Sequence, residues 1–163
     1  MVELDGRIAR VLEASGQPFE VMDCDPALAD TEIFCAHYGQ SPAHSANTIV
    51  VKTKSGETRF VACLVLATTR LDVNRTVRKR LAARKASFAS AEETEAMTGM
   101  VLGGVTPLAL PPELPLWVDS RIMALDYVIL GGGDRASKIK VAPAIFHDLP
   151  NTEIVDGLAR PAD

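Results

Sequence analysis

The feature of this sequence that most constrains its fold is an unbroken apolar run of eight residues, from Phe60 to Ala67. A β-strand with apolar side chains on both faces is buried on both faces, and therefore lies at the centre of a sheet. Another strand pattern, residues 48–53, precedes it, and Ser55-Gly56 between them is a turn signal. The sequence therefore predicts a hairpin whose second strand is central. The run is far shorter than the ~20 residues of a membrane helix.

Helices and short strands are predicted on both sides of this hairpin. The helical patterns span residues 4–16, 31–38, 72–81, 90–99 and 143–149. The other strand patterns span residues 19–22, 116–118, 127–130, 138–141 and 153–155. In residues 138–141, Lys138 and Lys140 alternate with apolar residues, which predicts a half-exposed strand. Because the order shows no regular alternation of strand and helix, we expect one α+β domain, residues 1–163, around a mixed, largely antiparallel sheet.

Composition excludes several classes of protein. Hydrophobic residues are 47% and charged residues 23% of the 163, as in an ordinary globular domain with its own core. This excludes a disordered chain, a collagen-like repeat and a small disulfide scaffold. The net charge of −4 excludes a chain that is basic throughout. With 5% aromatic residues, a long stacking platform for single-stranded nucleic acid is not expected.

The expected location is the cytoplasm, without membrane contact. Residues 1–5 carry two acids and no apolar segment, so no signal peptide is expected. Cys24, Cys35 and Cys63 form no CxxC pair. An odd number of widely spaced cysteines is typical of reduced thiols in the cytoplasm.

Basic residues crowd one eleven-residue window of this acidic chain. The six are Arg75, Arg78, Lys79, Arg80, Arg84 and Lys85. In a helix that begins at Asp72, three of them lie away from the apolar stripe of Val73, Val77 and Leu81. The pattern indicates a phosphate-binding face, with RNA as the expected ligand. A solvated helix face without a ligand has the same pattern, so charge alone leaves both interpretations open.

Two glycine clusters each follow an apolar run, Gly103-Gly104 and Gly131-Gly132-Gly133. Glycine lets the backbone approach a ligand closely and expose its N–H groups. Two such loops can line one pocket and bind a developing oxyanion. Tight turns are the structural alternative. Neither cluster matches a nucleotide-binding glycine motif.

A metal site and a nucleophile have little support in the pattern. Cys35 and His37 are two residues apart on a predicted helix, so they point to different sides, and no zinc-type spacing is present. No G-x-S-x-G sequence occurs, although a Ser/His/Asp arrangement stays open. Cys63 lies within the apolar run, where a core position is expected.

The segment from Thr98 to Pro107, TGMVLGGVTP, resembles the TG-x₃-GG-[IV]-x-P signature of the YbaK/EbsC-like aminoacyl-tRNA deacylases. These are free-standing relatives of the editing domain inserted in bacterial prolyl-tRNA synthetases. Other landmarks follow the family's order: Asp72 before the basic segment, the strand pattern 114–119, and Gly132-Gly133 with Arg135. The resemblance covers roughly residues 17–158.

This resemblance implies a mixed, barrel-like sheet flanked by helices. It implies hydrolysis of the ester that joins a wrong, small amino acid to the 3′ end of tRNA, in the service of translation fidelity. A synthetase is a second partner to consider. No metal, cofactor or protein nucleophile is expected, because the bound substrate and a water supply much of the chemistry.

The resemblance also implies roles for particular residues. Backbone donors with a catalytic role are expected at Gly104, Gly132 and Gly133. Substrate-binding residues are expected at Gly103, Thr106, Pro107, Asp119 and Arg135, with a structural turn as the alternative for Asp119. Acceptor-stem phosphates would contact Arg75, Arg78, Lys79 and Arg84.

One position departs from the family's pattern. The family carries a lysine just before its first hairpin strand, in a pattern like K-[ST]-[LI]-[LVF]-[LV], and this lysine is regarded as important for activity. Here Asn47 stands at that position. Lys52 and Lys54 lie at odd offsets from Asn47, so a regular strand turns them to the opposite face. Asn47 donates and accepts hydrogen bonds but brings no charge. We place it in the catalytic set at the family's functional position.

Three functions follow from these observations. The leading one is a deacylase that acts in trans on mischarged tRNA. The alternative is a non-catalytic tRNA-binding or regulatory protein on the same fold, motivated by the missing lysine. A third is an enzyme or binder for a small, free aminoacyl-like ester, which keeps the pocket and needs no basic face.

Overall fold

The computed structural model describes residues 4–162. The helices are α1 (Gly6–Ser15), α2 (Thr31–Tyr38), α3 (Arg78–Arg80), α4 (Ala91–Thr98) and α5 (Ser120–Met123). The strands are β1 (Phe19–Asp23), β2 (Ala46–Thr53), β3 (Phe60–Leu66), β4 (Thr69–Leu71), β5 (Ala86–Phe88), β6 (Leu116–Asp119), β7 (Val128–Gly131), β8 (Ser137–Val141), β9 (Thr152–Val155) and β10 (Ala159–Pro161). Short 3₁₀ segments are η1 (Pro26–Leu28), η2 (Pro42–His44), η4 (Pro107–Ala109) and η5 (Pro143–Asp148), and η3 (Val73–Val77) is a turn of π-helix. Residues 1–3, on which the targeting expectation partly rests, and residue 163 lie outside this description.

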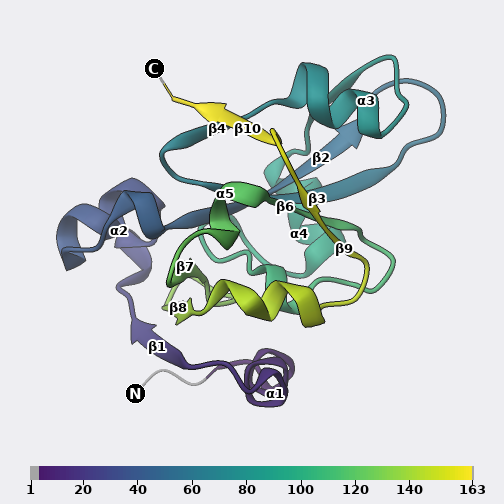
Figure 1. The fold of residues 1–163 in the computed structure, drawn as a ribbon. Coiled ribbons are helices and arrows are strands. Elements are labelled where there is room, and N and C mark those ends of the chain that lie inside the picture. The colour runs from purple at the N-terminus through teal and green to yellow at the C-terminus, as the bar shows by residue number, and fades with distance from the viewer. Residues whose placement is uncertain (1–3, 163) are drawn as a thin grey trace.

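The larger sheet has five strands in the order β5-β2-β3-β6-β9 (Figure 1). β2 and β3 form the predicted hairpin, antiparallel and with Val51 opposite Val61. β3 also pairs with β6, and β6 with β9, both in parallel. The sheet is therefore mixed, and β3 lies at its centre, as its apolar sequence predicts.

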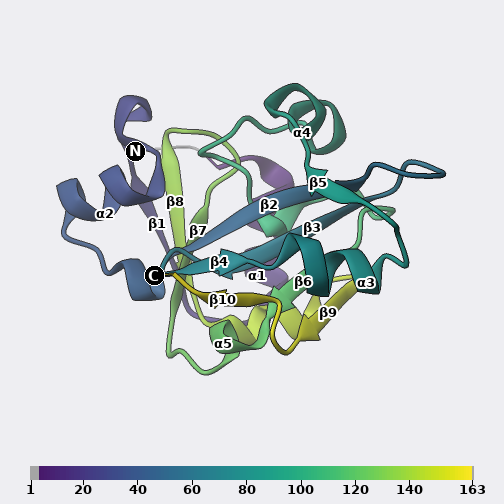
Figure 2. The same cartoon turned by 90° about the horizontal axis from the view of Figure 1, so that it is seen from above.

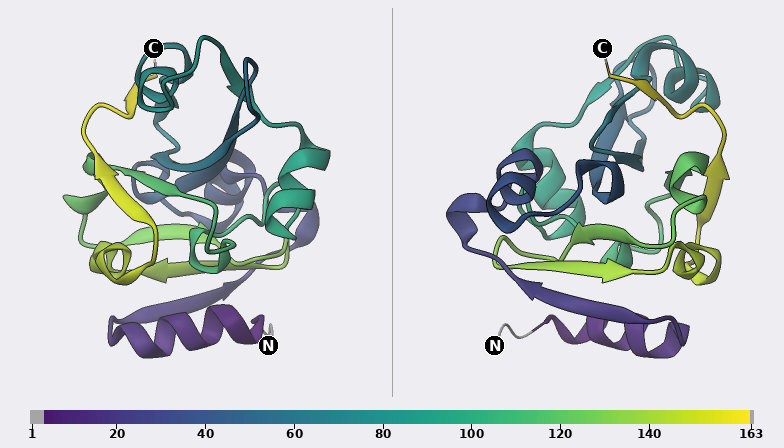
Figure 3. Two further views of the ribbon diagram at one scale, coloured as in Figure 1. Left: turned by 90° about the vertical axis from the view of Figure 1, so that its right-hand side faces the viewer. Right: turned by 60° about the vertical axis from the view of Figure 1, so that its left-hand side comes forward.

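A smaller sheet of three antiparallel strands has the order β1-β8-β7. Figure 3 shows α1 running alongside β1 at one end of the molecule. Side chains alternate across this sheet, as period-2 geometry requires. Leu130 and Ile139 belong to the main core, whereas Ile129 packs with Phe34 of α2. The second face is thus covered by α2, and this covering decides the surroundings of Lys138.

The two sheets do not close into a barrel. One bridge, from Ser45 to Ile129, joins the start of β2 to β7. In the described part of the chain, β5 and β9 end the larger sheet and pair with no strand of the smaller one. The barrel-like closure implied by the resemblance is therefore wrong, while the α+β class and the mixed sheet are confirmed.

Both faces of β3 are buried, by different parts of the chain. Ala62, Leu64 and Leu66 join the main core, which also holds side chains of α1, β7 and β8. Val61, Cys63 and Val65 face a second core. This core also contains Trp117, Val73 and Val77 of η3, and Leu81 after α3. Figure 2 shows α3 on the far side of the molecule from α2. Because Cys63 is fully buried, the pKa of its thiol rises to about 12, which suits a core residue and not a nucleophile.

Local signals predicted α2 and α4 well. Ser90 and Glu93 make both hydrogen bonds of a capping box at the start of α4. The helix expected from Asp72 differs: a π-turn leads into only three α-helical residues, and Asp72 caps no backbone N–H group. Its carboxylate instead accepts from the Thr76 hydroxyl at 3.0 Å. The stripe of Val73, Val77 and Leu81 is buried as predicted.

Several short elements carry no strong local signal and were not predicted. They are β4, β5, β10 and α5, each of three or four residues. Tertiary pairing holds them, since β4 and β10 pair with each other and β5 lies along β2. No helix in the described residues is long and apolar enough to cross a membrane.

Candidate functional site

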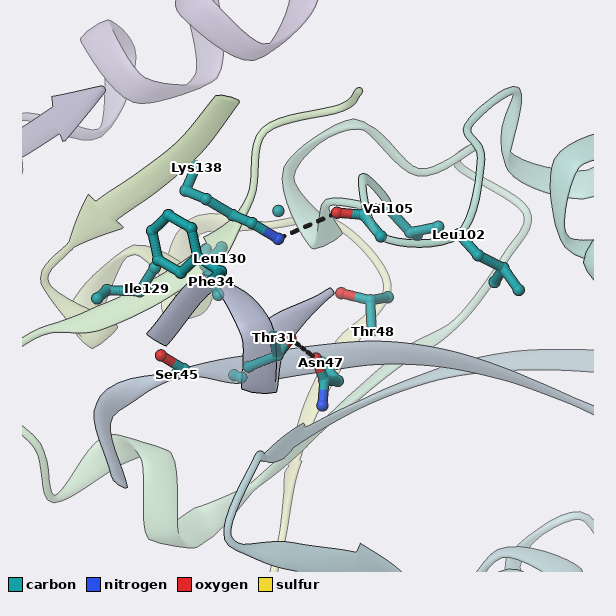
Figure 4. Close-up of a pocket in the computed structure, with 13 residues that line it drawn as sticks. Thr31, Phe34, Ser45, Asn47, Thr48, Leu102, Val105, Ile129, Leu130 and Lys138 are labelled. Carbon is teal, nitrogen blue, oxygen red and sulfur yellow. Dashed lines mark hydrogen bonds between the residues drawn. The ribbon is translucent and has the colours of Figure 1, made fainter. Parts of the chain in front are cut away.

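A small cavity of about 60 Å³ lies where the start of β2, the first turns of α2 and the ends of β7 and β8 meet the loop 101–105 (Figure 4). Its lining is Thr31, Phe34, Ser45, Ala46, Asn47, Thr48, Leu102, Gly103, Val105, Ile129, Leu130, Gly131 and Lys138. Asn47 and Gly103, both expected at the site, thus line one cavity. Lys138, Thr31 and Thr48 were not predicted.

Lys138 is the one charged side chain among the described residues that line the cavity. Its residue is 5% exposed, so the expected half-exposed position is wrong for this lysine. The strand alternation was read correctly, but α2 covers the face that carries it: the Lys138 ammonium lies 5.4 Å from the centre of the Phe34 ring. Its Nζ donates to the Ala29 carbonyl at 2.6 Å and to the Gly103 carbonyl at 3.0 Å.

Burial lowers the pKa of Lys138, because an ammonium loses its hydration in this environment. The neighbouring thiol of Cys24 opposes this shift, and Arg135 adds to it. Two carbonyl oxygens compensate part of the lost hydration. A buried amine with a shifted pKa at the wall of a cavity is a common property of functional sites.

Asn47 is held in place by α2. Its Oδ1 accepts a hydrogen bond from the Thr31 hydroxyl, which fixes the amide and leaves its NH₂ group for another partner. The next residue, Thr48, also lines the cavity, and its buried Oγ1 has no hydrogen-bond partner in the described structure. An unpaired hydroxyl at a cavity wall is available to a ligand or a water.

The two glycine loops contact each other instead of presenting free amides. Gly104 N–H donates to the Val101 carbonyl, Gly132 N–H to Ser137 and Gly133 N–H to Gly104, at 3.0, 3.1 and 2.7 Å. The three amides expected to bind an oxyanion therefore already have partners. A Cβ on Gly104 would lie 2.4 Å from the Asp134 carbonyl carbon. Glycine is thus required here for the close approach of two backbones.

Arg135 ties the second glycine loop to its surroundings. Its Nε donates to the Pro26 carbonyl at 2.9 Å, and its Nη1 reaches the Leu102 carbonyl at 2.9 Å and the Asp30 carboxylate at 3.0 Å. Arg135 is absent from the cavity lining. Its contacts place the loop 101–105 against the segment that leads into α2.

Three other predicted residues lie away from the cavity. Thr106 is fully buried, and its hydroxyl caps η4 through Leu108 N–H. Pro107 is the first residue of η4. Asp119 is fully buried at the end of β6, where it caps α5 and pairs with Arg121 at 3.3 Å. The contacts of Asp119 correspond to the structural turn that was its alternative.

The basic residues lie beside α3, which Figures 1 and 2 place across the molecule from α2. Arg75, Lys79 and Arg84 are exposed. Arg78 is half-buried and donates to the carbonyls of Asn74 and Ala83. Arg80, which was not in the predicted tRNA-binding set, pairs with Glu153. We define Arg75, Lys79 and Arg84 as the basic surface.

Lys52, the one lysine of β2, is absent from the cavity lining. It pairs with Glu93 of α4 at 2.8 Å, on the face expected from its odd offset. Within residues 4–162, no three His, Cys, Asp or Glu side chains are grouped as a metal site requires.

We compared the sequence and the structure with known protein families and solved structures. A family model described as the aminoacyl-tRNA editing domain matches residues 25–149. Among solved structures, the hypothetical protein APE2540 is 21% identical, with a TM-score of 0.81 over 94% of this chain and 99% of that chain.

Two further structures are 19% identical. A candidate trans-editing enzyme for prolyl-tRNA synthetase has a TM-score of 0.73, over 98% of this chain and 100% of its own. A scaffold protein used for computational grafting of linear epitopes has a TM-score of 0.76, over 96% of each chain. At such low identity these likenesses concern the fold. The family match spans most of the sequence, and the protein accordingly belongs to the aminoacyl-tRNA editing domain family.

Proposed function

We propose that this protein is a deacylase that acts in trans and hydrolyses the ester between a small amino acid and the 3′ end of tRNA. The observation that carries this proposal is the small cavity with a polar wall in a member of the editing-domain family. A cavity volume of about 60 Å³ favours a small amino-acid side chain over a large one. Exclusion by size is the principle of a second sieve in editing.

The cavity wall supplies both hydrogen-bond donors and hydrogen-bond acceptors. The Asn47 NH₂ group is a donor for the substrate, and the Thr48 hydroxyl is able to accept from or donate to an attacking water. Apolar side chains of Phe34, Leu102 and Ile129 surround these groups. An aminoacyl ester reacts readily with water, so orientation of the ester and the water accounts for much of the acceleration needed.

The basic surface supports the tRNA part of the proposal. Arg75, Lys79 and Arg84 are exposed and form no ion pair with any residue of the described chain, so phosphate groups are natural ligands for them. Binding of the acceptor stem there would weaken with salt, because phosphate binding releases counterions.

The test is deacylation of separate tRNAs charged with alanine, serine, threonine and cysteine. We expect turnover above the spontaneous rate for at least one of them, and lower turnover with Asn47→Ala. Salt-sensitive tRNA binding without turnover would support the non-catalytic alternative, which the uncharged Asn47 favours. Saturable hydrolysis of a small free ester that tRNA does not inhibit would support the third function.

A further inference from the structure

Lys138 is a buried charge at the wall of the cavity. Lys138 stands at the meeting point of two segments, since its ammonium contacts the carbonyls of Ala29 before α2 and of Gly103 in the glycine loop. A lysine ammonium has three N–H donors. The hydrogen bonds to Ala29 and Gly103 account for two of them, and the side chain borders the cavity (Figure 4).

A cation is an unfavourable choice for a purely structural link. Removal of an ammonium from water remains unfavourable even after relaxation of the protein. Two carbonyl oxygens can be joined by a neutral donor such as an amide NH₂ group without that cost. The charge itself is therefore the property that needs an explanation.

The free donors of the cavity are few. The N–H groups of Gly104, Gly132 and Gly133 already donate to backbone carbonyls. Among the described lining residues, the side chains that can still donate include Lys138, Asn47 and Thr48. Only the first of these carries a positive charge, and a fixed charge in a site shielded from water stabilises a developing anion more than a neutral donor does.

We propose that Lys138 is a catalytic residue whose ammonium binds the carbonyl oxygen of the aminoacyl ester and stabilises the oxyanion formed on it. This inference rests on the proposed deacylase function. Water adds to the ester carbon, and the C=O electron pair moves to the oxygen beside Lys138. The intermediate then collapses, and the bond to the ribose oxygen breaks. One proton of the water passes to that ribose oxygen and the other to solvent, while Lys138 keeps its own protons. The products are the free amino acid and uncharged tRNA.

The test compares Lys138→Met with Lys140→Met. Both lysines lie on β8 and point to the same face, but Lys140 stacks on Tyr127 outside the cavity. The readouts are the single-turnover rate on the aminoacyl-tRNA that the wild-type protein hydrolyses, the affinity for the same tRNA with an amide in place of the ester, and the melting temperature. We expect Lys138→Met to lose about 10²–10³-fold in rate with an affinity within a few-fold of wild type. Lys140→Met should keep the wild-type rate.

Lys138→Arg keeps a charge and donors at the same place, and provides a second variant if the methionine variant folds poorly. We expect it to recover part of the lost rate. A wild-type rate in Lys138→Met would overturn this inference alone and leave the deacylase function standing. Equal losses in affinity, melting temperature and rate, with no recovery in Lys138→Arg, would assign Lys138 a structural role instead. A wild-type protein inactive on every charged tRNA would overturn the proposed function and this inference with it.

Discussion

The two cationic regions of this protein differ in almost every respect. The basic surface consists of exposed side chains close together in the sequence, beside α3. The cavity holds one lysine, buried by segments that are far apart in the chain, namely α2, β8 and the loop 101–105. The cluster of basic residues in the sequence thus identifies charges that stay exposed to water. Lys138, the charge that folding buries, has no such signal among its neighbours in the sequence.

The difference also separates two roles in one reaction. Exposed charges act at long range and are screened by salt over about 10 Å at 0.1 M. A buried charge is screened much less and acts on atoms in contact with it. We therefore expect the basic surface to govern affinity for tRNA and Lys138 to govern the rate of hydrolysis.

The largest expected effect concerns the proton on Lys138. Its pKa is lowered mainly by burial, against the influence of Cys24, Asp30 and Cys35 and with that of Arg135. Because the charged form is the active one, deacylation should be constant below this lowered pKa and fall about tenfold per pH unit above it. The measurement is a rate–pH profile corrected for spontaneous hydrolysis.

Lys138→Arg provides the control for this profile. A guanidinium stays charged at alkaline pH, so the fall in rate should disappear. If the rate of Lys138→Arg falls at alkaline pH in the same way, the titrating group is not Lys138. The assignment of the hydrolysis rate to Lys138 and of tRNA affinity to the basic surface would then fail.

Charge reversal on the basic surface should affect affinity instead of chemistry. We expect the double variant Arg75→Glu and Lys79→Glu to weaken tRNA binding about tenfold to hundredfold at low salt, with a salt slope smaller by about 2. The single-turnover rate at saturating protein should stay at the wild-type value. The matched control is Arg7→Glu with Arg10→Glu on α1, which changes the net charge equally. Equal losses in both double variants would argue against a specific tRNA surface.

A lysine at position 47 should be a smaller perturbation, and a harmful one. Asn47 and Lys138 line the same cavity, so Asn47→Lys adds a second ammonium to a site that already holds one. Two ammonium groups close together lower each other's pKa, because each disfavours the charged form of the other. We expect about a tenfold loss of rate at neutral pH and an alkaline fall that begins at lower pH. A gain in rate would show that position 47 is the better place for the cation, and would argue against Lys138 as the charge that governs hydrolysis.

The smallest effect lies outside both regions. Ser90→Ala removes one half of the capping box of α4 and should lower the free energy of unfolding by about 1 kcal/mol. Deacylation and tRNA binding should not change. The measurement is chemical denaturation beside both activity assays, and a loss of activity would connect α4 to the site.

Local patterns account for the parts of the fold that the sequence predicts. The hairpin of β2 and β3 follows from apolar runs around a turn, and α4 from its capping box. The glycine clusters were expected to let the backbone approach a ligand, but the two loops approach each other, as the Gly133 to Gly104 hydrogen bond shows. Whether a glycine packs against a ligand or against another loop depends on tertiary contacts. The residues next to it in the sequence do not show which.

The same limit applies to Lys138. Alternation with Ile139 placed its side chain on the correct face of β8. Whether that face meets water or a helix depends on where α2 packs, about a hundred residues earlier in the chain. Asn47 was singled out because it stands at the family's lysine position, and the structure places it as the second residue of β2.

The pairing of β1 with β8 has a practical consequence for work on fragments of this protein. Met22 lies opposite Lys138 in the antiparallel register. The family match begins only at residue 25, so a fragment cut to residues 25–149 would lack β1 altogether. It would retain Lys138, yet the strand that carries it would become a bare sheet edge, open to association with other chains. Studies of the isolated family region would then report on aggregation as much as on hydrolysis.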